Sequence, residues 1–403
     1  MNTNKKAPKL RFKGFTDDWE QHKLSEITAR VTRKNGSQSD LPLTISAQDG
    51  LVDQRKYFNR QVASRDMSNY YLIKKGEFAY NKSYSEGYPF GAVKRLDYYD
   101  MGALSTLYIL FEITDKNISS DFIVSYYMTH LWHKEISKQA AEGARNHGLL
   151  NISTEDFFDS ELNIPNSIEE QVKIGNFIKQ FDKFINLYQR KLDKMKLNKR
   201  VLLQKLFPQN GCTIPEVRFK GFTDAWEQRK FGEIMTFLNG RAYKQDELLG
   251  DGKYKVLRVG NFYTNDSWYY SNLELDDKFY ATNGDLLYTW SATFGPHIWK
   301  GEKVIYHYHI WKLVLQDKID KLFALQLLEV DKANIMSDKN GSTMVHITKQ
   351  GMENKQTILP ISLNEQKQIA KFLSSMDKLI TLHQRKLDHL QLQKKALLQQ
   401  MFV

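Results

Sequence analysis

The sequence contains two copies of one unit, and this duplication limits the possible folds more than any other feature. The segment Arg11–Gln21 recurs as Arg218–Gln228 with one difference, at a spacing of 207 residues. We call these two segments the opening motifs. A second match, Gln189–Asp193 with Gln384–Asp388, has a spacing of 195. The first copy therefore has 12 additional residues in its middle.

The form of the repeat indicates what kind of partner the chain has. Solenoid proteins have periods of roughly 20–50 residues and need three or more copies, which argues against a solenoid. Two copies with similar ends and divergent middles suggest a partner that has approximate two-fold symmetry. DNA is the leading candidate.

Composition excludes several classes of protein. The chain has 403 residues, 41% of them hydrophobic, which is enough for two to three folded domains and argues against general disorder. Cys212 is the only cysteine, so no disulfide forms within the chain and a reducing, cytoplasmic location is expected. The polar, basic start Met1–Lys9 does not resemble a signal peptide. No stretch approaches the ~20 apolar residues of a membrane span, so no membrane partner is expected.

The positive charge is concentrated in two segments. The formal net charge is +11, which favours a polyanionic partner. Residues 166–207 hold ten basic against four acidic side chains, and residues 363–403 hold seven against three. The rest of the chain is close to neutral, so a DNA-binding region there needs a locally polarised face. Alternatively, long solvated helices are simply rich in lysine.

The middle of each copy reads as an α+β domain. Short strand-like runs are separated by Gly-containing turns. These runs are Phe78–Tyr80, Leu104–Ile113, Asp285–Trp290 and Lys303–Val314. A helix is expected near Asp121–Ala141 in the first copy and near Asp320–Ile335 in the second.

Each copy ends in a long amphipathic helix. Pro165 and Pro360 each precede a Glu-Gln pair, which suits a helix start. Apolar residues then alternate at spacings of three and four, the seam of a coiled coil. The central seam residues are Ile178, Phe181, Ile185 and Leu192 in the first helix, and Leu373, Met376, Ile380 and Leu387 in the second.

The two helices are expected to pair with each other. Each has an apolar stripe without another mate, and at ~1.5 Å per residue each is ~60 Å long. Parallel helices would require the chain to travel that length back through the second domain, so antiparallel pairing is favoured. Antiparallel pairing of two equivalent units creates an internal pseudo-two-fold axis. Lysine occupies one seam position in both helices, at Lys199 and Lys394. These lysines either fix the register of the pair or extend their ammonium groups into solvent from frayed ends.

At this point the sequence resembles a known family. The duplicated variable regions and heptad helices look like the DNA specificity subunit of Type I restriction–modification enzymes. The resemblance covers nearly the whole chain. It is carried by Pro165 with Glu170-Gln171, Pro360 with Glu365-Gln366, the two Gln-Arg-Lys-Leu-Asp segments, and the helix ends Leu206-Phe207 and Met401-Phe402.

The resemblance implies a domain order and a set of partners. It implies target-recognition domains at 1–162 (domain 1) and 217–357 (domain 2), helices at 163–207 and 358–403, and a linker at 208–216. Each domain would read one half of an asymmetric bipartite site on double-stranded DNA, with the helices setting the spacer. Two modification (methyltransferase) subunits and restriction subunits would dock on the chain. S-adenosylmethionine, ATP and Mg²⁺ would bind those partners, with no catalytic centre and no cofactor in this chain.

A search for catalytic motifs agrees with that implication. The sequence has no Asn/Asp-Pro-Pro-aromatic motif and no phosphate-binding loop, since Gly87–Lys94 has the wrong spacing. His307 and His309 alternate on an expected strand, but no further ligands accompany them, so no metal site is predicted. Two alternatives remain: a structural coiled-coil adaptor without DNA contact, and a nuclease or methyltransferase with an unrecognised active site.

Base reading requires side chains that reach a groove edge, such as Arg or Lys on guanine and Asn or Gln on adenine. Three Gly/Asn-rich loops in each domain are candidates. In domain 1 the candidate DNA-binding residues are Arg33, Lys34, Asn35, Gln38, Lys82, Ser83, Tyr84, Arg145, Asn146 and His147. In domain 2 they are Arg241, Tyr243, Lys244, Thr289, Trp290, Ser291, Thr293, Ser342, Thr343 and His346.

The aromatic residues of the opening motif have two interpretations. Phe12, Phe15 and Trp19 are apolar anchors that fix the start of the chain, or they form a docking surface for partner subunits. The sequence leaves this choice open.

Overall fold

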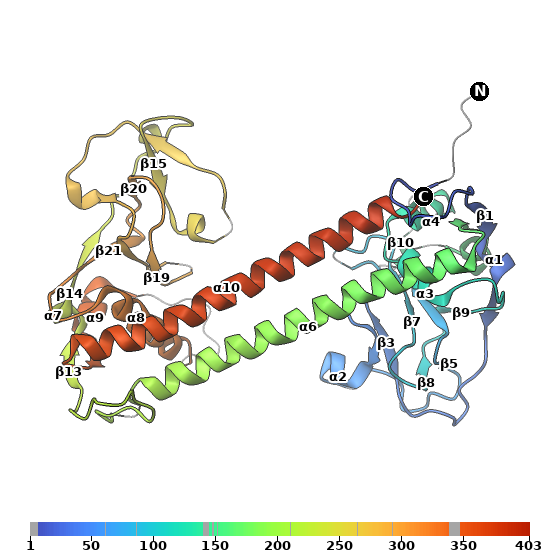
Figure 1. Cartoon of the computed structure of the whole chain (residues 1–403), viewed down its shortest axis with the longest axis horizontal. Coiled ribbons are helices and arrows are strands. Elements are labelled where there is room, and N and C mark those ends of the chain that lie inside the picture. Colours follow the sequence, from blue (N-terminus) through green and yellow to red (C-terminus); the bar gives the residue numbers. More distant parts are fainter. Residues whose placement is uncertain are drawn as a thin grey trace. The chain divides into compact units, whose positions relative to one another are not determined.

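The chain divides into two compact units in the computed structural model (Figure 1). The first unit comprises residues 1–189 and 385–403, and the second comprises residues 190–384. Each unit therefore contains one domain and a part of both long helices. The structure describes residues 7–60, 62–85, 87–139, 145–146, 149–150, 152–209, 211–263, 265–291, 293–337 and 347–403.

The first unit is an α+β domain built on a four-stranded antiparallel sheet. Its helices and strands are, in chain order, β1 (Glu20–Lys23), α1 (Leu24–Ile27), β2 (Thr28–Val31), β3 (Leu43–Ser46), β4 (Gly50–Asp53), α2 (Gln54–Phe58), β5 (Tyr71–Lys74), β6 (Phe78–Asn81), β7 (Ala92–Arg95), β8 (Met101–Leu104), β9 (Ile109–Ile113), α3 (Ser120–Tyr126), α4 (Leu131–Gln139), β10 (Arg145–Asn146), β11 (Leu149–Leu150), α5 (Thr154–Phe158), β12 (Glu161–Ile164) and the start of α6 (Ile168–Leu206). The sheet order is β2-β9-β6-β7. Stacked rings of Phe78 and Phe111, 5.1 Å apart, lie in its core.

The second unit repeats this plan. Its helices and strands are β13 (Glu227–Lys230), α7 (Phe231–Ile234), β14 (Met235–Asn239), β15 (Tyr254–Leu257), β16 (Tyr269–Ser271), β17 (Tyr280–Ala281), β18 (Leu286–Thr289), β19 (Gly295–Ile298), β20 (Val304–Tyr306), β21 (Ile310–Leu315), α8 (Lys321–Ser337), α9 (Lys349–Asn354), β22 (Gln356–Leu359) and α10 (Leu363–Gln400). The order β14-β21-β18-β19 matches the sheet of domain 1. A second sheet, β16-β15-β20-β17, has no four-stranded counterpart among the described sheets of domain 1.

Several predicted elements are confirmed, and three are divided. β6, β18 and α8 lie where they are expected. The run Leu104–Ile113 forms two strands, and so does Lys303–Val314. The predicted helix Asp121–Ala141 is two helices, because the Thr129 hydroxyl donates to the carbonyl of Tyr126 and accepts from the backbone N–H of Leu131. These hydrogen bonds end one helix and begin the next.

The opening motif of each copy is held to the start of a long helix by a buried ion pair. Arg11 donates two hydrogen bonds to the carboxylate of Glu170, at 2.6 and 2.8 Å. Arg218 does the same to Glu365, at 2.7 and 2.8 Å. The Glu170 and Glu365 side chains are only 1–2% exposed. The Glu of the Glu-Gln pair is therefore the anchor point of the repeated opening motif.

The Gln of the same pair joins the long helix to its own domain. The Gln171 amide donates to the carbonyls of Asn117 and Pro165 and accepts from the backbone N–H of Ser119. Gln366 makes the same three bonds, to Lys318, Pro360 and Asp320. Both glutamine side chains are buried. The Pro–Glu-Gln motif thus positions each helix against each domain in the same way.

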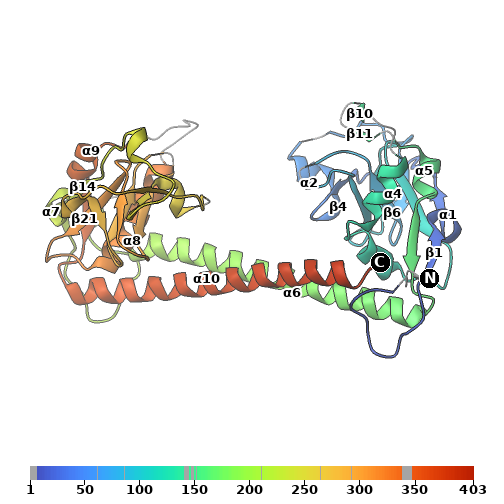
Figure 2. The same ribbon diagram turned by 90° about the horizontal axis from the view of Figure 1, so that it is seen from above.

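The end of each long helix packs on the opening motif of the other copy. In the first unit the Phe402 ring lies 6.1 Å from Trp19, so the chain ends beside domain 1 in both views (Figures 1 and 2). In the second unit the Phe207 ring lies 5.9 Å from Trp226. Both tryptophans are 2% exposed. The anchoring interpretation of Trp19 is therefore confirmed.

Within each unit the two long helices run antiparallel. In the second unit Lys196 contacts Gln384, and Lys199 forms an ion pair with Asp377. In the first unit Lys394 forms an ion pair with Asp182. All eight central seam residues are buried or half-buried, as a seam requires.

The seam lysines are paired rather than extended into solvent. The pairs Lys199–Asp377 and Lys394–Asp182 are equivalent, since both residues differ by 195 positions between the copies. The two lysine side chains are only 16% and 17% exposed. Solvation of these lysines at frayed ends is therefore excluded, and an apolar seam that carries this ion pair in each unit favours a single register.

Among the described residues, no helix combines the length and apolar character that crossing a bilayer requires.

Candidate DNA-reading surfaces

In domain 2, strand topology brings two of the predicted loops to one end of the main sheet. Thr289, at the end of β18, pairs with both Ile310 and Gly295. Asn239, at the end of β14, pairs with Trp311 on the same central strand. The loops that follow β14 and β18 therefore lie side by side.

The turn between β20 and β21 lies at the same end and was expected to be strand. Its residues His307–His309 bond to both predicted loops: Arg241 exchanges backbone hydrogen bonds with Tyr306 and Tyr308, and the indole N–H of Trp290 donates to the Tyr308 carbonyl. The strand is interrupted because the N–H of Ile310 donates to the His307 carbonyl. Alternation of residues predicts a strand but does not detect such a turn.

The histidines at this end are neutral. Burial lowers the pKa of His307 to about 4, with the neighbouring His309 and Arg258 acting in the same direction. Burial also lowers the pKa of His309. At pH 7 these imidazoles can donate or accept hydrogen bonds, but they add no positive charge to the surface.

Some candidate residues of domain 2 serve the fold. The Thr289 side chain is buried and donates to the Gly295 carbonyl, so we remove it from the candidate set. Arg241 is held by Glu247, at 2.7 and 2.9 Å, and Trp290 stacks on Trp311 at 5.8 Å. Half-buried Tyr243 packs in a small core cluster. Base contact was predicted from turn-type composition, which does not reveal these partners.

The remaining candidates of domain 2 are more accessible. Lys244 and Thr293 are exposed, and Ser291 is half-buried. The third predicted loop, with Ser342, Thr343 and His346, lies outside the described residues.

Domain 1 presents the equivalent end of its sheet. Val31 at the end of β2 pairs with Leu110, and Tyr80 near the end of β6 pairs with Ile109. The loops after β2 and β6 therefore lie together. β11 joins them, since the N–H of Leu150 donates to the Lys82 carbonyl.

Two candidates in the first loop of domain 1 have partners within the domain. Arg33 donates to both oxygens of Glu77, whose side chain is 8% exposed. Burial raises the pKa of Glu77, although the Lys74 N–H and Arg33 lower it. Asn35 is 1% exposed, and its amide bonds to Ser39 and Met67. We therefore remove Asn35 from the candidate set, whereas Arg33, whose side chain is 32% exposed, stays a prediction.

The other candidates of domain 1 divide by accessibility. Gln38, Tyr84 and Lys34 are exposed, and the Lys34 ammonium lies over the Tyr71 ring at 4.7 Å. Ser83 is half-buried, and the Lys82 ammonium donates to the Ile152 carbonyl. Arg145 and Asn146 form strand β10, but their side chains lie outside the described part of the structure. All of His147 lies outside it as well.

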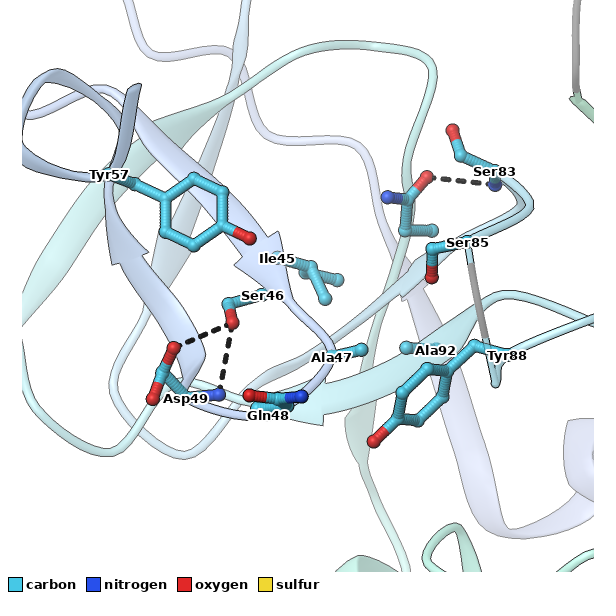
Figure 3. Close-up of a pocket in the computed structure, with 11 residues that line it drawn as sticks. Ile45, Ser46, Ala47, Gln48, Asp49, Tyr57, Ser83, Ser85, Tyr88 and Ala92 are labelled. Carbon is cyan, nitrogen blue, oxygen red and sulfur yellow. Dashed lines mark hydrogen bonds between the residues drawn. The ribbon is translucent and has the colours of Figure 1, made fainter. Parts of the chain in front are cut away.

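A polar hollow of about 470 Å³ lies at this end of domain 1 (Figure 3). Gln48 and Tyr57 line one side of it, and Ser83, Ser85 and Tyr88 line the other. The exposed Gln48 lies in the β3–β4 turn and was not predicted. The sequence signal for this turn was its polar run, which ends at Gly50. The φ of Gly50 is 85°, a backbone conformation that favours glycine.

Among the described residues, no group of three or more His, Cys, Asp or Glu side chains could hold a metal ion.

Comparison with known proteins decides the family. A family model described as Type I restriction modification DNA specificity domain matches residues 17–197 and 223–392. The chain belongs to this family. Each match contains one domain and most of the long helix that follows it, so this specificity chain contains the family's domain twice.

Curated relatives are specificity subunits. The Type I restriction enzyme MjaVIII specificity subunit of Methanocaldococcus jannaschii is 30% identical over 197 residues, which are 48% of this chain and 44% of the relative. The putative MjaX specificity subunit of the same organism is 23% identical over 405 residues, covering 95% of this chain and 92% of the relative. The specificity chain thus spans less than half of the first relative and nearly all of the second.

Solved structures share the fold. The S subunit of a Type I restriction–modification system from M. genitalium aligns with a TM-score of 0.60 at 14% identity, covering 98% of this chain and 99% of that one. A chain from a study of assembly and conformational transition in a type I system aligns at 0.56 with 15% identity, covering 94% and 96%. The two-domain α+β fold of the specificity chain is therefore shown.

Proposed function

We propose that this chain is the sequence-recognition subunit of a Type I restriction–modification complex. Each domain reads one half of an asymmetric bipartite site on double-stranded DNA, and the long helices set the spacer. We call the buried ion pair, the glutamine network and the helix seam the frame. The frame occurs twice, on the same plan, beside two sheet ends that differ in sequence, and this observation carries the proposal. A repeated frame with different loops suits one geometry of approach and two different half-sites.

In this proposal the chain contributes recognition and assembly, and its partners contribute chemistry. The modification and restriction subunits bind S-adenosylmethionine, ATP and Mg²⁺ and act on DNA in the cytoplasm. The purified chain alone is expected neither to methylate nor to cut DNA. A purely structural adaptor would bind its partners without the steep salt dependence of DNA binding.

Methylome sequencing of a host that expresses this chain with its modification subunits tests the proposal. A bipartite methylated motif is expected. The variants Gln38→Ala and Lys244→Ala form a matched pair, since both residues are exposed and lie on equivalent loops of domains 1 and 2. Each is expected to relax one half of the motif only, because a lost base contact costs about 1–3 kcal/mol of discrimination. Absence of a bipartite motif, or relaxation of both halves by either variant, would contradict the proposal.

Apolar side chains on the outer faces of the long helices support docking of two modification subunits. Phe184 and Leu187 are 52% and 53% exposed on α6, and the equivalent Leu379 and Leu382 are 48% and 62% exposed on α10. Exposed apolar residues that recur at equivalent positions mark an interaction surface better than scattered ones do. Two equivalent surfaces suit two copies of one partner.

Substituting the surface on one helix should therefore remove one partner. Phe184→Ser with Leu187→Ser is expected to reduce the modification subunits that co-purify with the chain from two to one, and Leu379→Ser with Leu382→Ser should do the same. Mass of the intact complex gives the stoichiometry. Val201→Ser, an exposed position on the same helix, is the control. Retention of two subunits by both double variants would place docking elsewhere.

A further inference from the structure

A cleft of about 820 Å³ lies within the first unit, between domain 1 and the long helices. Its walls are β7, the segment between α3 and α4, and the facing parts of α6 and α10, which Figure 1 labels. It shares Gln48, Tyr88 and Ala92 with the hollow of Figure 3. The cleft therefore continues from the candidate reading surface toward the helices.

Lysines from three elements line this cleft. Lys94 lies on β7, Lys183 on α6, and Lys394 and Lys395 on α10. Lys394 is paired with Asp182. Lys94, Lys183 and Lys395 form no ion pair within the described part of the chain. Acidic residues also line the cleft, but Asp121 is bound to Arg95 and Lys179.

Lys94 is the unusual member of this group. Its side chain is half-buried, and burial lowers its pKa, with Lys394 acting in the same direction. Asp182 and Asp49 only partly oppose this effect. A dehydrated cation beside a second cation is unfavourable unless an anion joins them.

The second unit lacks this cation although it has the same frame. His297 on β19 pairs with Leu287 as Lys94 on β7 pairs with Ala79, so the two positions are equivalent. The His297 ring stacks on Phe262 at 4.1 Å, and burial lowers its pKa to about 4, so it is neutral at pH 7. The ion pair Lys199–Asp377 is nevertheless kept. Lys94 is therefore an addition in domain 1 and not a part of the repeated frame.

We propose that this cleft binds a phosphodiester group of duplex DNA, with Lys94 as the phosphate donor and Lys183 and Lys395 adding positive charge to the cleft lining. The inference rests on the proposed function and names a contact within it. A lysine ammonium is a compact charge suited to phosphate. Phosphate contacts fix the position of a protein on the duplex without reading sequence. The cleft continues from the hollow of Figure 3. A phosphate contact in the cleft would therefore hold the DNA in place while the residues of the hollow face its bases.

The test measures DNA affinity of the full chain in complex with its modification subunits as salt rises from about 50 to 200 mM. Lys94→Gln is expected to weaken binding by roughly three- to tenfold and to reduce the slope of log K against log[salt] by about 0.9, the value of one lost phosphate contact. Duplexes with and without the recognised site should be affected equally, and the methylated motif should not change. Lys94→Arg should restore the slope, whereas Lys116→Gln, at an exposed lysine after β9, should leave it unchanged.

The outcomes separate the two proposals. If the unmodified complex shows no salt-dependent DNA binding, the proposed function fails. If it binds DNA and Lys94→Gln keeps the full slope, the phosphate contact is overturned and the proposed function stands. Inorganic phosphate at constant ionic strength distinguishes the source of the anion. If phosphate binds the unmodified complex but not the Lys94→Gln complex, and the DNA slope is unaffected, the cleft takes a free anion instead.

Discussion

Replacing Arg11 with alanine is expected to destabilise the first unit by about 3–5 kcal/mol, because it leaves the Glu170 carboxylate buried without a counter-ion. The carboxylate is 1% exposed, and both of its oxygens accept from Arg11. Water cannot take over these hydrogen bonds without opening the contact between the opening motif and α6. The loss should be visible as faster hydrogen exchange in β1 and β12 and as a lower midpoint of unfolding.

The second copy provides a matched control. In Arg218→Ala the Glu365 carboxylate keeps the indole N–H of Trp226, at 3.2 Å, whereas the indole N–H of Trp19 has no hydrogen-bond partner among the residues that the structure describes. Arg218→Ala should therefore cost less than Arg11→Ala. Replacing both Arg11 and Glu170 with methionine should recover most of the loss, since no buried charge remains. A loss below about 1 kcal/mol for Arg11→Ala would show that the pair does not anchor the motif.

The repeated frame could be predicted from sequence because its signals are local. The heptad pattern of residues such as Ile178 and Leu373 defines the seam without knowledge of the fold. The opening motif and the Glu-Gln pair could also be recognised, because the same residues occur in both copies of the repeat. Their contact was not, because Arg11 and Glu170 are 159 residues apart and no periodicity links them.

The reading loops were predicted less well than the frame. Arg33, Asn35 and Thr289 stand in polar, glycine-containing stretches that resemble binding loops. Whether such a side chain faces DNA or the protein depends on a distant partner, as Glu77 shows for Arg33. The composition of a loop indicates that it is a turn, but it does not indicate the direction of its side chains. Gln48 was not predicted, because a polar turn that ends in glycine does not by itself indicate DNA contact.

The seam lysines show where a sequence pattern leaves two physical outcomes open. A lysine in an apolar seam either reaches solvent or finds a carboxylate on the facing helix. Asp182 and Asp377 stand in the sequences of the two helices, but their positions relative to Lys394 and Lys199 depend on the register of the pair. The register in turn depends on packing at both ends of each helix.

The same register leads to the prediction with the largest effect on specificity. Adding one heptad after Lys191 and one after the equivalent Lys386 should lengthen the spacer of the methylated motif by about three base pairs and leave both half-sequences unchanged. Seven residues add about 10.5 Å to a helix, and base pairs are about 3.4 Å apart. A whole heptad keeps the seam facing the partner helix, and insertion in both helices keeps Lys199 opposite Asp377 and Lys394 opposite Asp182.

Inserting the heptad into α6 alone is the decisive control. α6 contributes residues to both units, as does α10, so one longer helix cannot preserve both Lys–Asp pairs at once. We expect this variant to lose methylation at the original motif without gaining a motif of new spacing. Methylome sequencing of both strains measures the outcome directly. An unchanged spacer in the doubly extended variant would refute the role of the helices in setting it, whereas changed half-sequences would mean that the helices also take part in base reading.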